Sequence, residues 1–289
     1  MKLNKWQQLF QELELYFTDE IFKRYLKKFN FDLIQGKSKE VILSEIAKVL
    51  LKYNISDGFM KLTNLEKREL NTSIGEKIIN SLQEEYKVEN KALNNIVKEV
   101  VVDQYNATNF IYGISYDIKP VSDKMIKDII KYTIEGKNYS DRIWDNKDTL
   151  AKNMQKIVFD FLNGKHNVNE IYDIVQEKYK SNREISERLV RTEIARVQEE
   201  SNELWRQQHG ISYVLYCATL DSCTCGKCQE LDNKSYAINE DRPKLPRHPK
   251  CRCTYLDLVS PDWRPKLRFD NESKQTIIWT DFNKWKEGR

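Results

Sequence analysis

Two short segments, DSCTCGKC at residues 221–228 and HPKCRC at residues 248–253, decide the fold of the C-terminal part of this chain. Two residues separate Cys225 from Cys228 and His248 from Cys251, and nineteen residues lie between the two pairs. Two intervening residues let a tight turn aim both side chains at one point, so each pair can hold one edge of a tetrahedron. We therefore expect one zinc ion bound by Cys225, Cys228, His248 and Cys251.

Two further thiols leave the exact ligand set open. Cys223 and Cys253 each lie two positions outside the inner set and are alternate ligands. Four protein ligands leave no position for a water molecule, so we predict a structural zinc ion rather than a catalytic one. A redox Cys-x2-Cys pair, which would need a thioredoxin-like βαβ setting, and unligated buried thiols are the competing interpretations.

The residues around these segments cannot form a large core of their own. The stretch ISYVLYCAT, residues 211–219, is β-branched and aromatic and predicts a strand, in which Cys217 would fill the core. Five of the six prolines lie between Pro243 and Pro265, which predicts loops and short strands after it. We therefore expect residues 211–258 to form a small β unit that the zinc ion stabilises.

Most of the remaining chain has helical periodicity. Apolar residues recur at helical spacing from Lys5 to about Val175, with expected breaks that include residues 30–39 and 106–122. A further helix is predicted to begin at Ser181, where Ser181 and Glu184 have capping-box spacing, and to end at Gly210. The predicted fold class is α+β, predominantly α-helical with a small C-terminal zinc-stabilised β unit.

The breaks also suggest a domain organisation. We predict a helical N-terminal region at residues 1–115, a second domain at residues 116–258 that ends in the zinc-binding β unit, and a C-terminal tail at residues 259–289.

Composition excludes several classes of protein. The chain has 289 residues, of which 40% are hydrophobic and 32% charged, a balance typical of a globular protein. Its apolar runs are shorter than the roughly 18 residues of a membrane span, and the amphipathic N-terminus does not resemble a signal peptide. We expect no membrane association, and the crowded cysteines favour metal binding in a reducing cytoplasm.

Positive charge concentrates near the predicted metal site. The net charge of the chain is +4, but residues 242–268 contain eight basic and two acidic residues, a local charge of +6. Such a cluster can contact nucleic-acid phosphates without reading sequence. The candidate DNA-contacting residues are Arg247, Lys250, Arg252, Arg264, Lys266 and Arg268.

An ordered set of motifs extends over residues 139–258. It begins with YSDRIWDNKDTL at 139–150 and FLNGKHNVNEIYDIV at 161–175, and continues with Arg191-Thr192-Glu193 and the helix end at Gly210. It closes with Asp221-x3-Cys225-x2-Cys228-x2-Leu231 and with His248-Pro249-x-Cys251-Arg252-Cys253. In this order the motifs resemble the phage minor head protein family, the Mu F-like head morphogenesis proteins of tailed bacteriophages.

The resemblance implies a minor capsid protein. Such a protein associates with the phage portal protein during head assembly, contacts or accompanies the packaged DNA, and resides in the virion, in the capsid interior or at the portal vertex, after assembly in the host cytoplasm. The major capsid or scaffold protein is a further expected partner. About 30 residues follow the signature, too few for the toxin or transferase domain of some relatives, so we expect no enzyme activity.

Two alternatives come from other functional classes. The first is a zinc-stabilised HNH-type nuclease, suggested by His248-Pro249 beside metal-binding cysteines. It would need a second metal ion and a general-base histidine, and only His166 and His209 remain if His248 binds zinc. The second alternative is a zinc-ribbon DNA-binding protein, which would need a basic recognition element.

Overall fold

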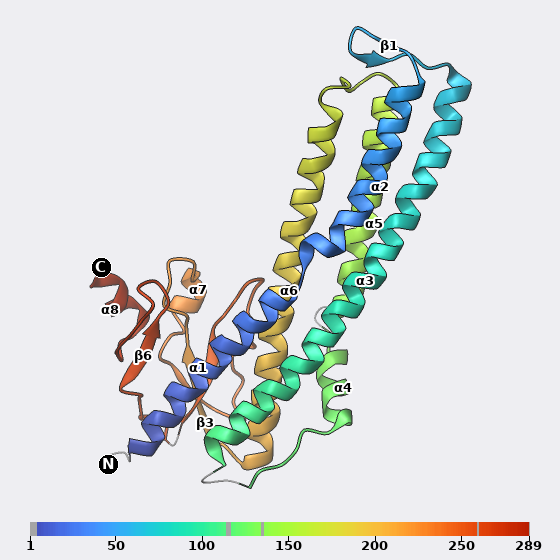
Figure 1. The fold of residues 1–289 in the computed structure, drawn as a ribbon. Helices are drawn as coiled ribbons and strands as arrows, with labels where there is room; N and C mark the ends of the chain where they lie inside the picture. The colour runs from blue at the N-terminus through green and yellow to red at the C-terminus, as the bar shows by residue number, and fades with distance from the viewer. Residues whose placement is uncertain (1–4, 114–116, 134–135, 259, 289) are drawn as a thin grey trace. The chain divides into compact units, whose positions relative to one another are not determined.

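A computed structural model describes residues 5–113, 117–133, 136–258 and 260–288 of the protein (Figure 1). It is mainly helical with a few small antiparallel sheets, which confirms the predicted α+β fold class. The helices are α1 (Lys5–Lys28), α2 (Phe31–Lys52), α3 (Asn64–Tyr112), α4 (Asp123–Lys131), α5 (Tyr139–Leu162), α6 (Ile171–His209), α7 (Gly226–Gln229) and α8 (Phe282–Glu287). The strands are β1 (Ile55–Ser56), β2 (Phe59–Met60), β3 (Tyr213–Cys217), β4 (Ser235–Ala237), β5 (Thr254–Leu258), β6 (Leu267–Asp270) and β7 (Gln275–Ile278).

Contacts between residues divide the chain into two compact units. Unit 1 comprises residues 1–28, 95–132 and 190–289, and unit 2 comprises residues 29–94 and 133–189. The long helices α3 and α6 therefore contribute residues to both units. These units follow contacts in space, whereas the boundaries at residues 115 and 258 were drawn from breaks in the sequence, and those boundaries stay a prediction.

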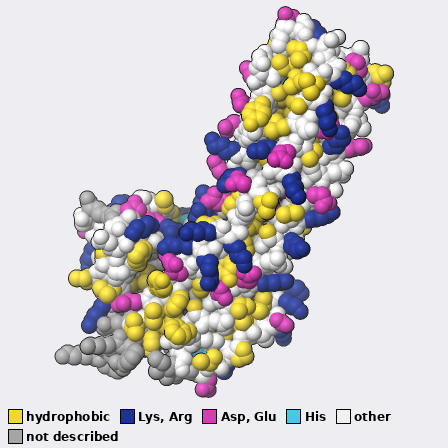
Figure 2. Space-filling view, in the orientation of Figure 1, with side chains coloured by type: hydrophobic (Ala, Val, Ile, Leu, Met, Phe, Trp, Pro, Cys, Tyr) yellow, Lys and Arg dark blue, Asp and Glu magenta, His cyan; other side chains and the backbone are white. Residues whose placement is uncertain are grey.

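Unit 2 is a bundle in which α2, α5 and parts of α3 and α6 run side by side (Figure 1). Apolar side chains from all four helices form one buried cluster, which includes Ile42, Ile78, Met154, Phe161 and Val175. The hairpin of β1 and β2 closes one end through a turn in which both Asp57 and Gly58 have positive φ, as a two-residue hairpin loop requires. On the face of unit 2 drawn in Figure 2, basic and acidic side chains are interspersed.

The bundle also buries a charged group. The Lys147 ammonium lies 2.6 Å from carboxylate oxygens of both Glu85 and Glu89, and all three side chains are almost fully buried. Lys147 also donates to Asn182 Oδ1 at 3.1 Å. An ion this deeply buried must be compensated, and these contacts connect α3, α5 and α6 at one point.

Two sequence predictions about helix boundaries are wrong. The chain does break at residues 29–30, but residues 31–39 of the expected break are helical, because Asn30 accepts a hydrogen bond from Leu33 N and α2 begins at Phe31. The helix expected to begin at Ser181 instead begins at Ile171. Buried residues on both sides of Ser181, including Tyr179 and Asn182, pack into the bundle, so tertiary contacts override the local capping signal. The break expected at 106–122 begins only after Tyr112, and residues 114–116 lie outside the described residues.

A three-stranded antiparallel sheet with the order β4-β3-β5 forms part of unit 1. As predicted, α6 ends next to Gly210, whose φ of +66° is the left-handed conformation of a helix C-terminus, and a strand follows. This central strand, β3, pairs Tyr213 with Leu258 and Cys217 with Thr254 of β5. The Cys217 side chain is buried, in agreement with its predicted role in the core.

Residues that follow the predicted boundary at 258 contact the sheet and the apolar cluster around the cysteines. The hairpin of β6 and β7 carries Arg268, whose guanidinium is 2% exposed and lies 2.9 Å from the buried carboxylate of Asp232. It also donates to Ala218 O at the end of β3, at 2.6 Å. Phe282 and Trp285 of α8 pack into the same apolar cluster as Cys228. Residues 260–288 therefore form part of the core around the cysteines.

A second buried arginine connects this sheet to two helices of unit 1. Arg206 of α6 is fully buried, and its guanidinium lies 2.6 Å from carboxylate oxygens of both Glu199 and Asp257. A carboxylate oxygen of Glu14, on α1, lies 3.7 Å from the same guanidinium. The other oxygen accepts a hydrogen bond from the Tyr112 hydroxyl at 3.1 Å. Burial raises the pKa of the Glu14 carboxyl, and nearby Asp257 raises it further. The cluster thus joins α1, α6 and β5 and favours a protonated Glu14.

We predict that Glu14 makes stability depend on pH. A carboxyl whose pKa is higher in the folded than in the unfolded state stabilises the fold below its unfolded pKa, and this contribution is lost as pH rises through the folded pKa. Urea denaturation between about pH 5 and about pH 9 should therefore show that the wild-type protein loses stability with rising pH, and that Glu14→Gln loses less. Glu12→Gln, on the same helix and half-buried, is the matched control and should behave as wild type. Equal slopes for all three proteins would contradict the assignment.

We also predict that Arg268 holds the C-terminal hairpin in place. Arg268→Met leaves the Asp232 carboxylate buried without its partner, so the free energy of unfolding should fall by about 3–5 kcal/mol. Lys266→Met removes an exposed cation just before the same strand, β6, and should change the free energy of unfolding by less than about 0.5 kcal/mol. Urea denaturation monitored by tryptophan fluorescence measures both. Equal stability of the two variants would show that the buried pair is not needed.

Candidate metal centre

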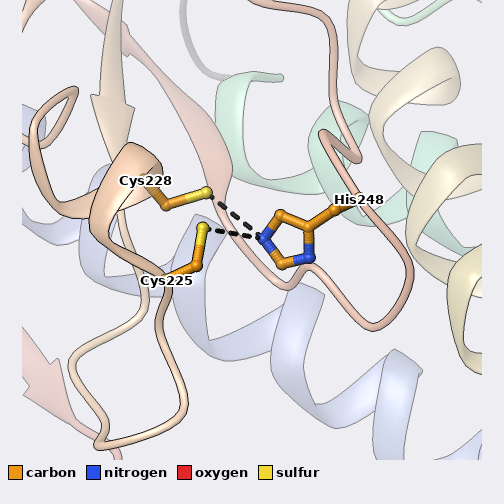
Figure 3. A group of neighbouring side chains, drawn as sticks. All are labelled: Cys225, Cys228 and His248. Atoms are coloured by element: carbon orange, nitrogen blue, oxygen red, sulfur yellow. Dashed lines mark hydrogen bonds between the residues drawn. The ribbon is translucent and has the colours of Figure 1, made fainter.

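The first pair of cysteines lies where a loop enters the short helix α7. Cys225 is the residue before this helix, and its carbonyl accepts hydrogen bonds from Cys228 N and Gln229 N, both at 3.0 Å. This single turn directs the Cys225 and Cys228 thiols to the same side (Figure 3). Because Gly226 has open space where a side chain would lie, the turn forms without crowding.

Asp221 shapes the same loop and links it to the second one. Its Oδ1 accepts hydrogen bonds from Cys223 N at 3.0 Å and from the Thr224 hydroxyl at 2.9 Å. Its other oxygen forms an ion pair with Arg252, which stands between Cys251 and Cys253. The acid that precedes the cysteine pair thus acts as a connector between the two cysteine-bearing segments rather than as a ligand.

The second segment presents an imidazole nitrogen to the first pair. His248 Nδ1 lies 2.9 Å from the carbonyl of Pro249, so it is placed to donate its proton there. That tautomer leaves the lone pair of Nε2 free, which is the form that binds metals. His248 Nε2 lies 3.3 Å from Cys225 Sγ and 3.5 Å from Cys228 Sγ (Figure 3). Lys250 has a positive φ of +64°, so the chain turns directly before Cys251.

Five donor side chains meet at Cys228. Cys225, Cys228 and His248 form one group whose ligand atoms lie within 4.8 Å of one another, and Cys228, Cys251 and Cys253 form another. The predicted inner set and the alternate Cys253 are therefore brought together. Cys223 is exposed and belongs to neither of these groups.

Cys253 differs from the other four donors in its surroundings. It is half-buried and, with Arg252, lines a cavity of about 300 Å³ that is also bordered by residues of α1 and α6. Cys251, by contrast, is 3% exposed. Cys251 is thus the more enclosed of the two thiols that can complete a four-ligand shell.

Hydrogen bonds favour the thiolate form at the centre of the cluster. The Cys253 thiol donates to Cys228, and together with the hydrogen bond from Tyr216 this contact lowers the pKa of Cys228 to about 4. The hydrogen bond with Cys253 also lowers the pKa of Cys251 to about 7. Since the thiolate is the form that binds metals, these two cysteines are prepared for coordination.

The donor set fits a metal ion of intermediate softness. Thiolate and imidazole ligands suit zinc, and four of the five donors are enough for tetrahedral coordination. The described residues around Cys228 can therefore hold a metal ion.

The structure adds two residues that the sequence did not single out as part of the site. Tyr216 of β3 is fully buried and donates a hydrogen bond from its hydroxyl to Cys228 Sγ at 3.2 Å. Thr192 of α6 accepts a hydrogen bond from Lys250 N at 3.1 Å, which joins the second loop to the helix. The alternation of side chains along the predicted strand at 211–219 places Tyr216 on the other face of the sheet from Cys217. No local feature of the sequence predicts that the Tyr216 hydroxyl contacts a thiol.

The candidate DNA-contacting residues are not equally available. Arg247, Lys250 and Lys266 are exposed, and Arg252 is exposed while paired with Asp221. The half-buried Arg264 donates to Asn233 Oδ1 at 2.8 Å. Arg268 is buried in its ion pair with Asp232, so its prediction as a phosphate contact is wrong.

Comparison with family models, curated proteins and solved structures found no match to this chain. Within the described residues, the helices include none with a long enough apolar stretch to cross a membrane.

We predict that metal binding depends on Cys228, which both groups of donors share. Cys228→Ser should lose zinc on dialysis against a chelator and unfold the β3–β5 sheet, because metal binding contributes about 10–16 kcal/mol to folding in small structural sites. Cys223→Ser removes an exposed thiol outside both groups and should keep the wild-type metal content. Elemental analysis by mass spectrometry and circular dichroism measure the two effects. Unchanged zinc content in Cys228→Ser would refute this prediction.

Proposed function

We propose that this protein is a non-enzymatic head morphogenesis protein of a tailed bacteriophage, whose cysteine cluster binds one structural zinc ion. Its main partner is the phage portal protein, with the major capsid or scaffold protein as a further partner. The protein acts in the host cytoplasm during assembly and remains in the virion, in the capsid interior or at the portal vertex.

One contact gives the strongest support to this proposal. Lys250 N, in the His248-Pro249-x-Cys251 motif, donates to Thr192 in the Arg191-Thr192-Glu193 motif at 3.1 Å. These residues are 58 positions apart in the chain, yet both belong to the set of motifs that resembles the phage minor head proteins. A direct contact between them is what a shared structural signature predicts.

The choice of a structural zinc ion rests on the number of donors. We assign Cys225, Cys228, His248 and Cys251 as the ligands, since Cys251 is more enclosed than Cys253. A shell of four protein ligands has no open position for an activated water molecule, which favours a structural over a hydrolytic role. In this role the metal holds two loops together and fixes the surface that a partner contacts.

Non-specific contact with packaged DNA forms a further part of the proposal. Lys227, Arg247 and Lys250 are exposed beside the metal ligands, and Lys266 is exposed nearby in sequence. Such cations can bind phosphates regardless of base sequence, with an affinity that falls as salt rises. The protein would accordingly tolerate any packaged sequence.

We predict that the portal protein copurifies with this protein from cells in which the encoding phage assembles. Tagged wild-type protein and Cys223→Ser should recover portal protein and enter purified heads, whereas Cys228→Ser should do neither, because loss of zinc disrupts the unit. Quantitative mass spectrometry of pull-downs and of heads measures this.

The same preparations distinguish the nuclease alternative. Recovery of the tagged wild-type protein without portal protein would contradict the assembly role. So would metal-dependent cleavage of plasmid DNA that His248→Ala abolishes while zinc remains bound.

A further inference from the structure

A hollow of about 250 Å³ opens between α2 and α6 of unit 2. Cationic side chains from both helices line it: Lys39 of α2, and Lys180 and Arg183 of α6. The only carboxylate among its lining residues is Asp32, which forms an ion pair with Arg183. The lining residues therefore sum to a charge of +2. Lys180 also contacts the exposed carboxylate of Glu177, which does not line the hollow, at 3.8 Å.

The floor of the hollow is polar and held in place. Gln35 and Tyr179 line it, and both are buried. Gln35 Nε2 donates to Asn182 Oδ1 at 3.1 Å, and the Tyr179 hydroxyl donates to Ser38 Oγ at 2.9 Å. Asn182 in turn accepts from the buried Lys147, so the floor belongs to the network that fixes the bundle. Rigid support of this kind keeps the hollow open without a ligand.

Gly36 provides the space. A side-chain Cβ added at this helical position would have no atom within 4 Å. Glycine in the middle of a helix costs roughly 1 kcal/mol relative to alanine, so its presence calls for a reason other than helix stability. Here the missing side chain leaves open the volume that the three cations surround.

We propose that this hollow binds a small phosphate-bearing anion, held by Lys39, Lys180 and Arg183. A concave site lined by one sign of charge concentrates the opposite ion, and lysine and arginine form charge-assisted hydrogen bonds with phosphate oxygens. Arg183 would share its guanidinium between Asp32 and the anion. Lys39, whose ammonium contacts Gln176 Oε1 at 3.4 Å, would exchange this long contact for the anion.

The chain supplies matched controls on the same two helices. Lys37 of α2 and Lys178 of α6 are each two positions from a lining lysine, are exposed, and do not line the hollow. Lys180→Glu and Lys178→Glu thus make the same change in net charge on the same helix. Because Lys180 is itself exposed, its substitution should leave the fold intact.

The experiment titrates the full-length protein with inorganic phosphate and follows the Gly36 amide by ¹H–¹⁵N NMR, with sodium chloride at matched ionic strength as the reference. Wild type, Lys37→Glu and Lys178→Glu should show saturable shifts with phosphate but not with chloride. Lys39→Glu and Lys180→Glu should each weaken phosphate binding by about ten- to a hundredfold, because each removes a charge-assisted contact. Gly36→Leu, which fills the hollow and changes no charge, should also abolish saturation.

Two results would overturn the proposal. The first is a linear, non-saturating response that chloride reproduces, which indicates ionic screening alone. The second is equal binding by Lys180→Glu and Lys178→Glu, which places the anion outside the hollow. Circular dichroism of every variant confirms that the bundle is folded, so that loss of binding reports on the hollow.

Discussion

The C-terminal part of this protein depends on the convergence of two loops on the Cys228 thiol. Thiolates cannot be brought to within a few ångströms of one another without compensation, because like charges repel and buried charges lose hydration. A bound cation removes this repulsion. The hydrogen bonds from Tyr216 and Cys253 already offset part of it, which explains why the loops can adopt this arrangement around a shared sulfur.

Buried arginines extend this arrangement into the rest of unit 1. Arg268 ties the last hairpin to Asp232, and Arg206 ties α1 and α6 to Asp257 of β5. Both cations contact the small sheet or the residue that directly follows its central strand, beside the apolar clusters that the sheet buries. Desolvation makes each pair costly to break, so the pairs specify one arrangement of the helices and loops even where their net contribution to stability is modest.

Unit 2 uses the same strategy in a helical setting. Lys147 compensates two buried glutamates at the centre of the bundle, and its network reaches the floor of the hollow between α2 and α6. A polar network inside an apolar bundle fixes the register of the helices, because any slip would leave a charge unpaired. It also maintains a rigid polar surface next to Gly36, where the helices do not fill the space between them.

The sequence alone determined the features that local spacing encodes. The two x2 pairs predicted which residues gather at the metal centre, Gly210 predicted the end of α6, and β-branched residues predicted β3. Only the tertiary structure decided that α6 continues through Ser181, that Cys253 joins the cluster while Cys223 does not, and that Arg268 is buried. The deciding partners are distant in the chain: Asn182 contacts Gln35, which lies 147 positions away, and Arg268 contacts Asp232, which lies 36 positions away. Local sequence specifies turns and periodicity, but it does not specify which buried charges pair with one another in the folded protein.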